Sequence, residues 1–252
     1  MGKIVALANQ KGGVAKTTTA INLAASLSVL GKKVLLVDAD PQANATSGLK
    51  FDINLPNLYD CMTGDKQAKE VIVQSPELKK LWVLPSSINL VGADTELANI
   101  ENGHFIIKGI LDSVKEDYDY VLIDCSPSLG YTTVNALVAA DSVLIPVQPE
   151  YFALEGLSKL LNTIKLVKTK LNTRLEIEGF LITLYSNNRM HNQVVAEVKE
   201  YFSDRVYDTI IQRNIRIVEA SSHGKPVILY DASAPGSSKY LALAKEFIKR
   251  NR

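Results

Sequence analysis

The chain has 252 residues, of which 46% are hydrophobic and 22% are charged, and its formal net charge is +1. A chain of this length can bury one large core, so we expect a single domain over residues 1–252. A net charge this close to zero excludes nucleic-acid binding through overall charge and leaves only a local basic patch. No apolar stretch approaches the roughly 18 residues of a membrane span, and we expect no signal peptide. The two cysteines, Cys61 and Cys125, lie far apart without metal-ligand spacing, which fits a reducing cytoplasm.

Short apolar runs rich in β-branched residues alternate with helical segments along the chain. Continuous apolar runs are typical of strands covered on both faces, as in parallel sheets. The alternation predicts an α/β fold with a doubly wound, mainly parallel sheet. Strands are predicted at residues 3–8, 33–40, 81–87, 120–126, 142–148, 177–185 and 206–211. Helices are predicted at residues 17–31, with Gly31 as the C-terminal stop, and at 104–116, 130–139, 153–170, 190–202 and 237–250.

The first predicted strand runs into the segment ANQKGGVAKTTT, residues 8–19. A phosphate-binding loop usually reads G-x-x-x-x-G-K-[ST] between a strand and a helix. Here Gln10 and Ala15 occupy the two outer glycine positions, and the loop holds two lysines, Lys11 and Lys16, where the pattern requires one. The order of strand, glycine-rich loop and helix predicts a P-loop nucleotide site. The alternative is a glycine turn that binds no ligand.

The chemistry of such a loop assigns a task to each residue type. Backbone N–H groups at the helix start point at the phosphates, and the helix dipole favours negative charge there. Lys16 would reach the terminal phosphates and the Thr17 hydroxyl would bind Mg²⁺. Because Lys16 must be helical, we expect a negative φ at Ala15; a positive φ would strain any residue other than glycine. The residues expected to line the nucleotide are Gly12, Gly13, Val14, Ala15, Lys16, Thr17 and Thr18.

The segment NQKGGVAKTTTAINLAASL, residues 9–27, resembles the deviant Walker A loop of the ParA/MinD group of P-loop ATPases. Its NQKGG start resembles the ParA (Soj) branch, which partitions chromosomes and plasmids. The resemblance implies ATP and Mg²⁺ as cofactors and an ATP-dependent sandwich homodimer. It also implies that Lys11 reaches across the interface to the partner's ATP and stabilises the charge that develops during phosphoryl transfer. The family normally has glycine where this chain has Ala15.

Two further segments resemble motifs of the same family and end in carboxylates. In VLLVDADPQANATSGL, residues 34–49, Asp40 matches the residue that positions or activates the attacking water. An aspartate with an ordinary pKa is a poor base, so we expect positioning. The alternative is a turn capped by the carboxylate, and it is stronger for Asp38 than for Asp40. YVLIDCSPSLG, residues 120–130, resembles Walker B and would place Asp124 near Mg²⁺.

The similarity continues through residues 146–164 and 210–231 and so spans essentially the whole chain. In the second segment, Gln212 and Asn214 match positions that border the adenine in the family. The resemblance therefore implies an ATPase in which Lys11, Lys16 and Asp40 are catalytic, and Thr17 and Asp124 bind the metal.

The resemblance also implies two macromolecular partners. ATP-bound ParA dimers bind DNA without sequence preference, which requires only clustered Lys and Arg on phosphates, and a ParB-like protein stimulates hydrolysis and release. The expected location is then the cytoplasm, on the nucleoid. The alternative is that the basic residues are ordinary solvated charges. The candidate DNA-binding residues are Arg189, Arg216, Lys239, Lys245 and Lys249.

Three rival functions remain open at this stage. A MinD-like membrane ATPase would use the C-terminal helix as an anchor, although its small residues favour packing on the domain. A relative of nitrogenase iron protein would need cysteines that bridge two subunits, for which Cys125 is poor support. A nucleotide-gated DNA-binding protein with negligible turnover is the third. His191 and His223 have no ligand-like partners and are expected in loops or on a helix surface.

Overall fold

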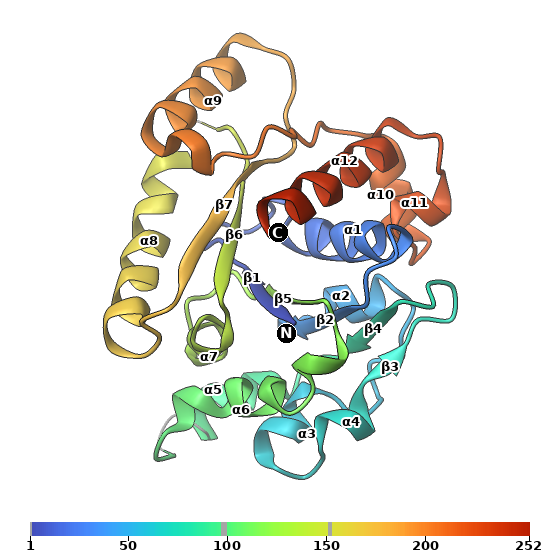
Figure 1. The fold of residues 1–252 in the computed structure, drawn as a ribbon, viewed down its shortest axis with the longest axis vertical. Helices are drawn as coiled ribbons and strands as arrows, with labels where there is room; N and C mark the ends of the chain where they lie inside the picture. Colours follow the sequence, from blue (N-terminus) through green and yellow to red (C-terminus); the bar gives the residue numbers. More distant parts are fainter. Residues whose placement is uncertain (1, 97–99, 151–152) are drawn as a thin grey trace.

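The computed structural model describes residues 2–96, 100–150 and 153–252, which form an α/β fold around a central sheet (Figure 1). Within the described residues the sheet has seven strands in the order β3-β4-β2-β5-β1-β6-β7. Neighbouring strands are parallel except β3 and β4. The predicted fold class is confirmed. The strands are β1 (Lys3–Leu7), β2 (Val34–Ala39), β3 (Val73–Gln74), β4 (Leu81–Leu84), β5 (Tyr120–Cys125), β6 (Ser142–Val147) and β7 (Glu176–Ile182).

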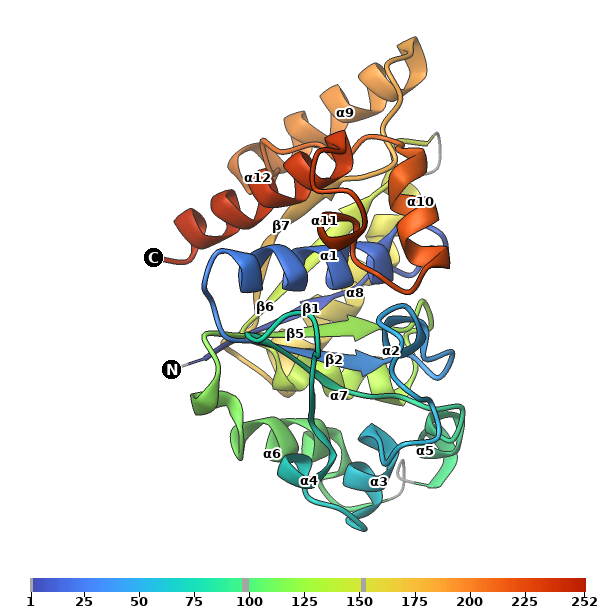
Figure 2. The same cartoon turned by 90° about the vertical axis from the view of Figure 1, so that its right-hand side faces the viewer.

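Helices cover both faces of this sheet. One apolar core lies between the sheet and α1, α10, α11 and α12, and a second lies under α3 to α9 (Figure 2). Because both faces are covered, β2, β5 and β6 are buried along their whole length, as their continuous apolar runs predict. The α-helices are α1 (Lys16–Val29), α2 (Asn44–Ser47), α3 (Leu58–Thr63), α4 (Ala68–Val71), α5 (Leu90–Glu96), α6 (Ile106–Asp112), α7 (Tyr131–Ala139), α8 (Ala153–Lys170), α9 (Arg189–Phe202), α10 (Ile215–Ser222), α11 (Val227–Tyr230) and α12 (Pro235–Arg250).

The first helix ends where the sequence predicts. Gly31 has a φ of 87°, a left-handed conformation that glycine adopts without strain. Its N–H bonds to the Ser28 carbonyl at 3.0 Å, and the Lys32 N–H bonds to the Leu27 carbonyl at 3.0 Å. These bonds satisfy carbonyls of the last turn, so Gly31 both closes α1 and turns the chain toward β2.

Two predicted elements are wrong. The helix expected at residues 104–116 is divided into a 3-10 turn at Gly103–Phe105, α6, and another 3-10 turn at Lys115–Asp117. The strand expected at residues 206–211 does not form, although Val206 and Gln212 make isolated bridges to the β7 side of the sheet. The N–H groups of Asp208 and Thr209 instead bond to the Glu246 carboxylate of α12 at 2.8 and 2.9 Å. That side chain takes the donors that a strand ladder would use.

The C-terminal helix packs on the domain, as its small residues predict. Leu243, Ala244 and Phe247 are fully buried in the core shared with α1. Within the described part of the chain, no helix is long and apolar enough to cross a membrane. The apolar face of α12 is therefore used by the core.

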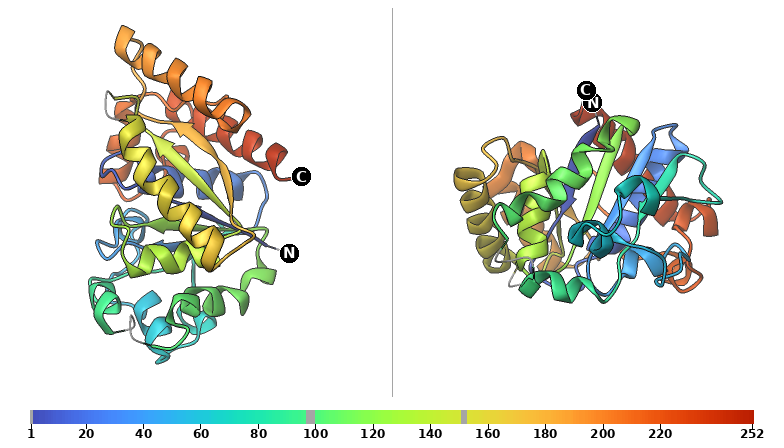
Figure 3. Two further views of the ribbon diagram at one scale, coloured as in Figure 1. Left: turned by 90° about the vertical axis from the view of Figure 1, so that its left-hand side faces the viewer. Right: turned by 90° about the horizontal axis from the view of Figure 1, so that it is seen from below.

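The first strand begins beside the end of the last helix, where the two ends of the chain lie near each other (Figure 3). The Lys3 ammonium donates to the carboxylate of Glu178 in β7 at 2.6 Å and also to the side chain of Asn251. Asn251 in turn donates to Glu178 at 2.6 Å. This polar cluster joins β1, β7 and the end of α12 at the edge of the sheet where the parallel strands begin.

Candidate nucleotide site

The candidate site lies where four adjacent parallel strands end. Strands β2, β5, β1 and β6 are neighbours in that order, so the segments that follow them meet at one edge of the sheet. Figure 2 shows β2 ending beside α2 at this edge. Ligands of doubly wound folds bind outside the carboxyl ends of the strands. The phosphate loop, defined here as residues 8–16 and so including the first residue of α1, follows β1 at the centre of this edge.

Helix α1 begins at Lys16 with its first N–H groups available. No side chain of the described residues caps its start, and its first turn holds no acidic residue. The Thr19 N–H makes the first intrahelical bond, to the Ala15 carbonyl at 2.9 Å. The N–H groups of Lys16, Thr17 and Thr18 thus have no intrahelical acceptor, and the helix dipole adds positive potential there. A negatively charged ligand fits this position.

The glycines of the loop differ in what they require. Gly13 has a φ of 74°, which explains its identity through backbone conformation alone. Gly12 has no positive φ, and a Cβ atom placed on it would meet no other atom within 4 Å. Neither conformation nor packing within the described chain demands glycine at position 12. Open space above the backbone is what a closely approaching ligand requires.

The backbone conformation of Ala15 differs from the prediction. Its φ is 64° and its ψ is 34°, a left-handed conformation, whereas a negative φ was expected. The expectation was wrong because Ala15 is the N-cap, and a cap residue lies outside the helical conformation that starts at Lys16. Left-handed backbone costs a residue with a Cβ roughly 1–2 kcal/mol. The loop of the free chain therefore already contains this strain.

Lys16 is the buried lysine of the loop. Its side chain folds back so that the ammonium donates to the Lys11 carbonyl at 3.2 Å. Burial lowers the pKa of Lys16, and the neighbouring groups Asp124, Cys125 and Asp40 oppose that effect. The ammonium is thus near the carboxylate of Asp124 in β5 and that of Asp40, which directly follows β2.

Asp124 lies one residue before the end of β5. Both of its carboxylate oxygens are buried and lack a hydrogen-bond partner among the described residues. Burial, followed by the charge of Asp38, raises the pKa of Asp124 well above its ordinary value, while the nearby Thr17 hydroxyl and the Lys16 ammonium lower it. A buried, unpaired carboxylate needs a cation. The Asp124 carboxylate and Thr17 hydroxyl fit Mg²⁺, which binds one or two protein oxygens together with phosphate oxygens.

The described residues offer no alternative metal site that is built from several protein side chains. The described residues contain no group of three or more His, Cys, Asp or Glu side chains that could hold a metal ion. Cys125 is buried at the end of β5, and burial raises its pKa, so its thiol stays protonated. A bound Mg²⁺ would therefore depend on ligand oxygens, as expected for a metal that arrives with a nucleotide.

Asp38 and Asp40 follow each other at the end of β2 but have different surroundings. The Asp38 carboxylate accepts bonds from the Thr46 N–H and hydroxyl, at 2.8 and 2.7 Å, and from the Asp40 N–H at 3.2 Å. Among the described residues, the Asp40 carboxylate accepts only the Gln42 N–H, at 3.0 Å. Asp38 thus holds the segment that follows β2 through hydrogen bonds, in agreement with the alternative interpretation that its carboxylate caps a turn. Asp40 has a second carboxylate oxygen available for another group.

Thr46 completes the hydrogen bonds around Asp38, and no sequence pattern predicted this role. Besides its two bonds to Asp38, its hydroxyl accepts the Ser86 N–H at 3.0 Å, and the Ser86 hydroxyl donates to the Asp40 carbonyl at 2.7 Å. Thr46 lies in α2, whereas Ser86 follows β4. A buried aspartate at a strand end needs donors nearby, and that need is the signal that could have identified them.

Gln212 and Asn214, predicted to border a base, lie beyond the end of β7. Gln212 is exposed and forms a parallel bridge with Tyr185. Asn214 caps α10, with its side-chain oxygen accepting the Arg216 N–H at 2.9 Å. The residues therefore lie at the edge of the sheet that carries the phosphate loop, and their ligand contacts stay a prediction.

The candidate DNA-binding residues do not form one patch. Arg216 lies in the first turn of α10, at the edge where the strands end, whereas Lys249 lies at the opposite end of the molecule in the last turn of α12 (Figure 2). Arg216 is paired with Glu219 at 2.8 Å and Asp231 at 3.5 Å. Lys245 and Lys249 form no ion pair within the described part of the chain. Lys245 borders a shallow hollow with Lys32 and Arg252.

The histidines behave differently from each other. His191 is buried, and its Nδ1 accepts the Ser186 N–H at 2.9 Å. The expectation of a loop or helix-surface position is therefore wrong for His191, because its ring closes the turn that leads into α9. His223 is exposed after α10, as expected, and its ring lies 2.8 Å from the Glu219 carbonyl.

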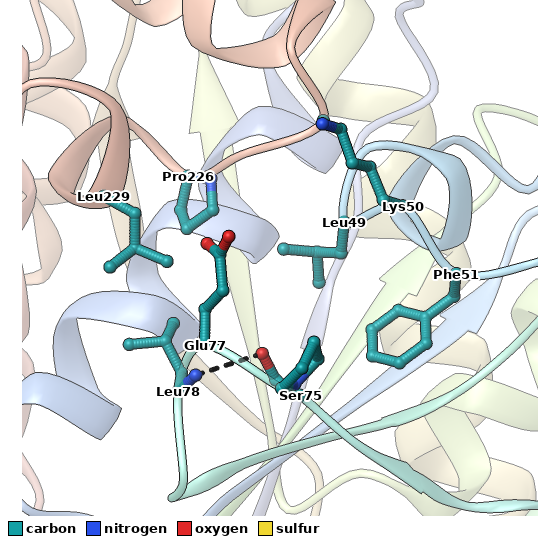
Figure 4. Close-up of a pocket in the computed structure, with 10 residues that line it drawn as sticks. Leu49, Lys50, Phe51, Ser75, Glu77, Leu78, Pro226 and Leu229 are labelled. Atoms are coloured by element: carbon teal, nitrogen blue, oxygen red, sulfur yellow. Dashed lines mark hydrogen bonds between the residues drawn. The ribbon is translucent and has the colours of Figure 1, made fainter.

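A separate apolar cavity of about 160 Å³ lies away from the phosphate loop (Figure 4). It is formed where the segments containing Leu49, Leu78 and Leu229 meet, and the Leu78 N–H bonds to the Ser75 hydroxyl at its floor. An ion pair of 2.8 Å between Lys225 and Glu77 lies beside it. Its lining has no buried charge, so it lacks the groups that would orient a polar ligand.

Together these features define a P-loop nucleotide-binding protein: a glycine loop after a central strand, an uncapped helix start, a buried lysine and an unpaired carboxylate at the next strand. A family model described as an AAA domain matches residues 2–177. The chain is 53% identical over 250 residues to the sporulation initiation inhibitor protein Soj of Bacillus subtilis, and the match covers 98% of each chain. It is 49% identical to the chromosome partitioning protein ParA of Myxococcus xanthus, covering 100% of this chain and 89% of that one.

A solved structure of a different enzyme has the same fold. Cobyrinic acid a,c-diamide synthase from Mycobacterium smegmatis, with a bound ATP analogue and magnesium, is 32% identical with a TM-score of 0.86, covering 100% of this chain and 98% of that one. One fold thus supports more than one reaction, and the sequence relatives decide between them. The chain belongs to the ParA/Soj family of partitioning ATPases.

Proposed function

We propose that this protein is a DNA-partitioning ATPase that works as an ATP-dependent homodimer. In this proposal, the ATP-bound dimer binds DNA without sequence preference, and hydrolysis stimulated by a ParB-like partner releases it. The observation that carries the proposal is the different placement of the two lysines of the loop. Lys16 is buried and directed into its own loop, whereas the Lys11 side chain is 39% exposed and directed out of it.

ATP and Mg²⁺ are assigned to the edge described above. The Lys16 ammonium and the N–H groups at the start of α1 would bind the phosphates, and Gly12 would let them approach the backbone. Thr17 and Asp124 would hold Mg²⁺, which neutralises charge on the phosphate oxygens when bound. The assignment of Mg²⁺ to Asp124 is supported by the burial of this carboxylate and by its two oxygens without a hydrogen-bond partner among the described residues.

Hydrolysis is assigned to Asp40 and the two lysines. Asp40 has a carboxylate oxygen to spare at the end of β2, beside the Lys16 side chain that it helps to keep charged. A carboxylate in this position can orient a water molecule toward a phosphate without needing a raised pKa. Lys11 of a second subunit would supply positive charge where the transition state gains negative charge.

The dimer is supported by exposed apolar side chains around the same edge. Ile53 follows β2, Ile88 and Val91 follow β4, and Ile215 and Val218 lie in the first turns of α10. Their exposed fractions lie between 50% and 69%. Exposed apolar groups that gather at one face mark an association surface. A second copy that closes over the nucleotide would cover them.

DNA binding is assigned to the basic residues at two sites. Lys245 and Lys249, with Lys239 on the same helix, form no ion pair among the described residues. Arg216 and Arg189 lie nearer the nucleotide edge. A lysine without an ion pair gives up no such contact when it binds a phosphate. Arg216 must first break its ion pairs with Glu219 and Asp231. A nucleoid-associated location would follow from such binding.

Sedimentation velocity with ATP and Mg²⁺ tests this function directly. The wild-type protein should shift from monomer to dimer, and Lys11→Ala should bind fluorescent ATP normally yet remain monomeric without hydrolysis. Lys66→Ala, which removes an exposed lysine from a surface turn, is the matched control and should dimerise. An ATP dimer with normal turnover in Lys11→Ala would refute the sandwich arrangement.

A further inference from the structure

Glu150 is the one acidic partner of Lys11 within the described residues. The Lys11 ammonium forms an ion pair with the Glu150 carboxylate, and the exposed fractions of the two side chains are 39% and 40%. The two residues are 139 positions apart in the chain. The pair therefore depends on the fold, and it holds the outward-facing lysine of the loop against its own subunit.

The fold places these two residues in contact through the pairing of β1 and β6. Leu7 in β1 lies beside Leu144 in β6. Just beyond the strands, the Asn9 side chain donates to the Pro146 carbonyl at 2.7 Å and accepts the Lys11 N–H at 3.0 Å. Asn9 thus joins the start of the phosphate loop to the end of β6.

The position of Glu150 is set by its own turn. Its N–H bonds to the Gln148 carbonyl at 2.8 Å, and its carbonyl accepts the Ala153 N–H at 2.8 Å as α8 begins. The hydrogen bond from Lys11 is the largest influence on the pKa of Glu150 and lowers it, and the charge of Arg213 acts in the same direction. Glu150 is therefore ionised at neutral pH, and the pair persists in the free subunit.

We propose that Glu150 holds Lys11 in the free subunit and that dimerisation replaces this carboxylate with the phosphates of the partner's ATP. This inference rests on the proposed function, in which Lys11 acts across the interface. Glu150 is then a positioning residue that opposes premature dimerisation and preforms the extended Lys11 side chain. Since both partners are partly exposed, the pair is weak enough to exchange.

The magnitude follows from the exposure of the pair. An exposed ion pair changes an equilibrium constant by roughly 1.4- to fivefold, and each dimer must break two of them. Glu150→Gln removes the charge and keeps the shape, so its ATP-dependent dimer should dissociate with a constant roughly two- to thirtyfold lower than that of wild type. Its association rate should rise, because Lys11 no longer has to be released before docking.

The test compares dimer dissociation constants and association rates in ATP and Mg²⁺. Glu176→Gln is the matched control, since it breaks an exposed pair of 2.5 Å with Lys168 at the start of β7 and removes the same charge. Glu150→Gln and Glu150→Ala should both dimerise more tightly, while Glu176→Gln should match wild type. ATP affinity at monomeric protein concentrations should be equal in all four proteins, which a general change in the loop would not allow.

The outcomes separate this inference from the function beneath it. A wild-type protein that stays monomeric with ATP would overturn the proposed function and this inference together. A wild-type dimer that Lys11→Ala abolishes supports the function; unchanged or weaker dimers of Glu150→Gln and Glu150→Ala would then overturn the role of Glu150 alone. Tighter dimers that persist in Lys11→Ala/Glu150→Gln would also overturn it, because the gain must pass through Lys11.

Discussion

Asp38 and Asp124 are direct neighbours across the parallel pair β2 and β5. Both carboxylates are completely buried, but Asp38 has three hydrogen-bond donors and Asp124 has none among the described residues. Burial raises the pKa of Asp38 to about 6 and that of Asp124 well above its ordinary value. Two carboxylates in such a place destabilise the free fold when both are charged, and a bound cation would relieve this.

Asp124→Asn should therefore stabilise the free protein and weaken its use of Mg²⁺. Removal of an unpaired buried charge is expected to raise the free energy of unfolding at pH 7 by about 1 kcal/mol or more. ATP binding should lose most of its enhancement by Mg²⁺. Urea denaturation and calorimetric titration measure the two effects, with Asp52→Asn in an exposed loop as the control.

The same change should alter the pH dependence of stability. Because burial raises the folded pKa of Asp38 and Asp124, their contribution is fully present below the ordinary value of 3.8 and is lost as pH rises through the folded pKa, about 6 for Asp38. Wild-type stability from these groups should thus fall across that window. Asp124→Asn should show a shallower fall; an identical profile would contradict the assignment of a raised pKa to Asp124.

Asp40→Ala should leave ATP binding intact and slow hydrolysis by roughly a hundredfold, because a group that orients water contributes on this scale. The ATP dimer should then persist on DNA. Asp52→Ala is a matched control, since Asp52 accepts the N–H two residues later at 2.9 Å, as Asp40 does at 3.0 Å. Steady-state phosphate release, with the partner present, measures the effect; equal rates in both variants would remove Asp40 from the mechanism.

Ala15→Gly should change stability more than affinity. The free loop already has Ala15 in the left-handed conformation, so the strain affects folding and not nucleotide binding. Relief of this strain is expected to raise the free energy of unfolding by about 1 kcal/mol, after allowance for the greater freedom of glycine in the unfolded chain. The dissociation constant for an ATP analogue should change by less than about tenfold. A larger gain in affinity would show that the loop relaxes when empty.

DNA binding should require ATP and weaken steeply with salt, without sequence preference. Lys245→Ala and Lys249→Ala should each lower affinity for all sequences alike and reduce the slope of log affinity against log salt by about one. Arg216→Ala should also weaken binding on all sequences, but less, because Arg216 is already paired with two carboxylates. Fluorescence anisotropy with DNA of several sequences tests this, with Lys168→Ala of α8 as the control. A sequence-specific footprint would contradict it.

The sequence was sufficient for the sheet and for the loop because both depend on local patterns. Continuous apolar runs predicted six strands of the sheet, and glycine, lysine and threonine spacing predicted the turn into α1. It was insufficient where distant groups decide local structure. The Glu246 carboxylate takes the donors of Asp208 and Thr209, and no pattern within residues 206–211 announces a helix that begins at Pro235.

The contacts of the site were the least accessible part for the same reason. The sequence indicated different roles for Lys11 and Lys16. It did not indicate Glu150, because Glu150 becomes a neighbour of Lys11 only when β6 lies beside β1. Ala15 shows that a local backbone conformation can also be predicted wrongly. Its backbone angle is set by how the loop closes on α1, which residue identity alone did not reveal.

The position of β1 inside the sheet determines when the site can exist during synthesis. Lys3 pairs with Tyr120, and Val5 pairs with Ser142, so both neighbours of β1 are made long after it. At about 5–20 residues per second, roughly 7 to 30 seconds separate the first strand from its last partner. Until then, β1 and α1 leave the ribosome with their apolar surfaces uncovered. The phosphate loop therefore gains both neighbouring strands, and the carboxylate of Asp124 beside it, only late in synthesis.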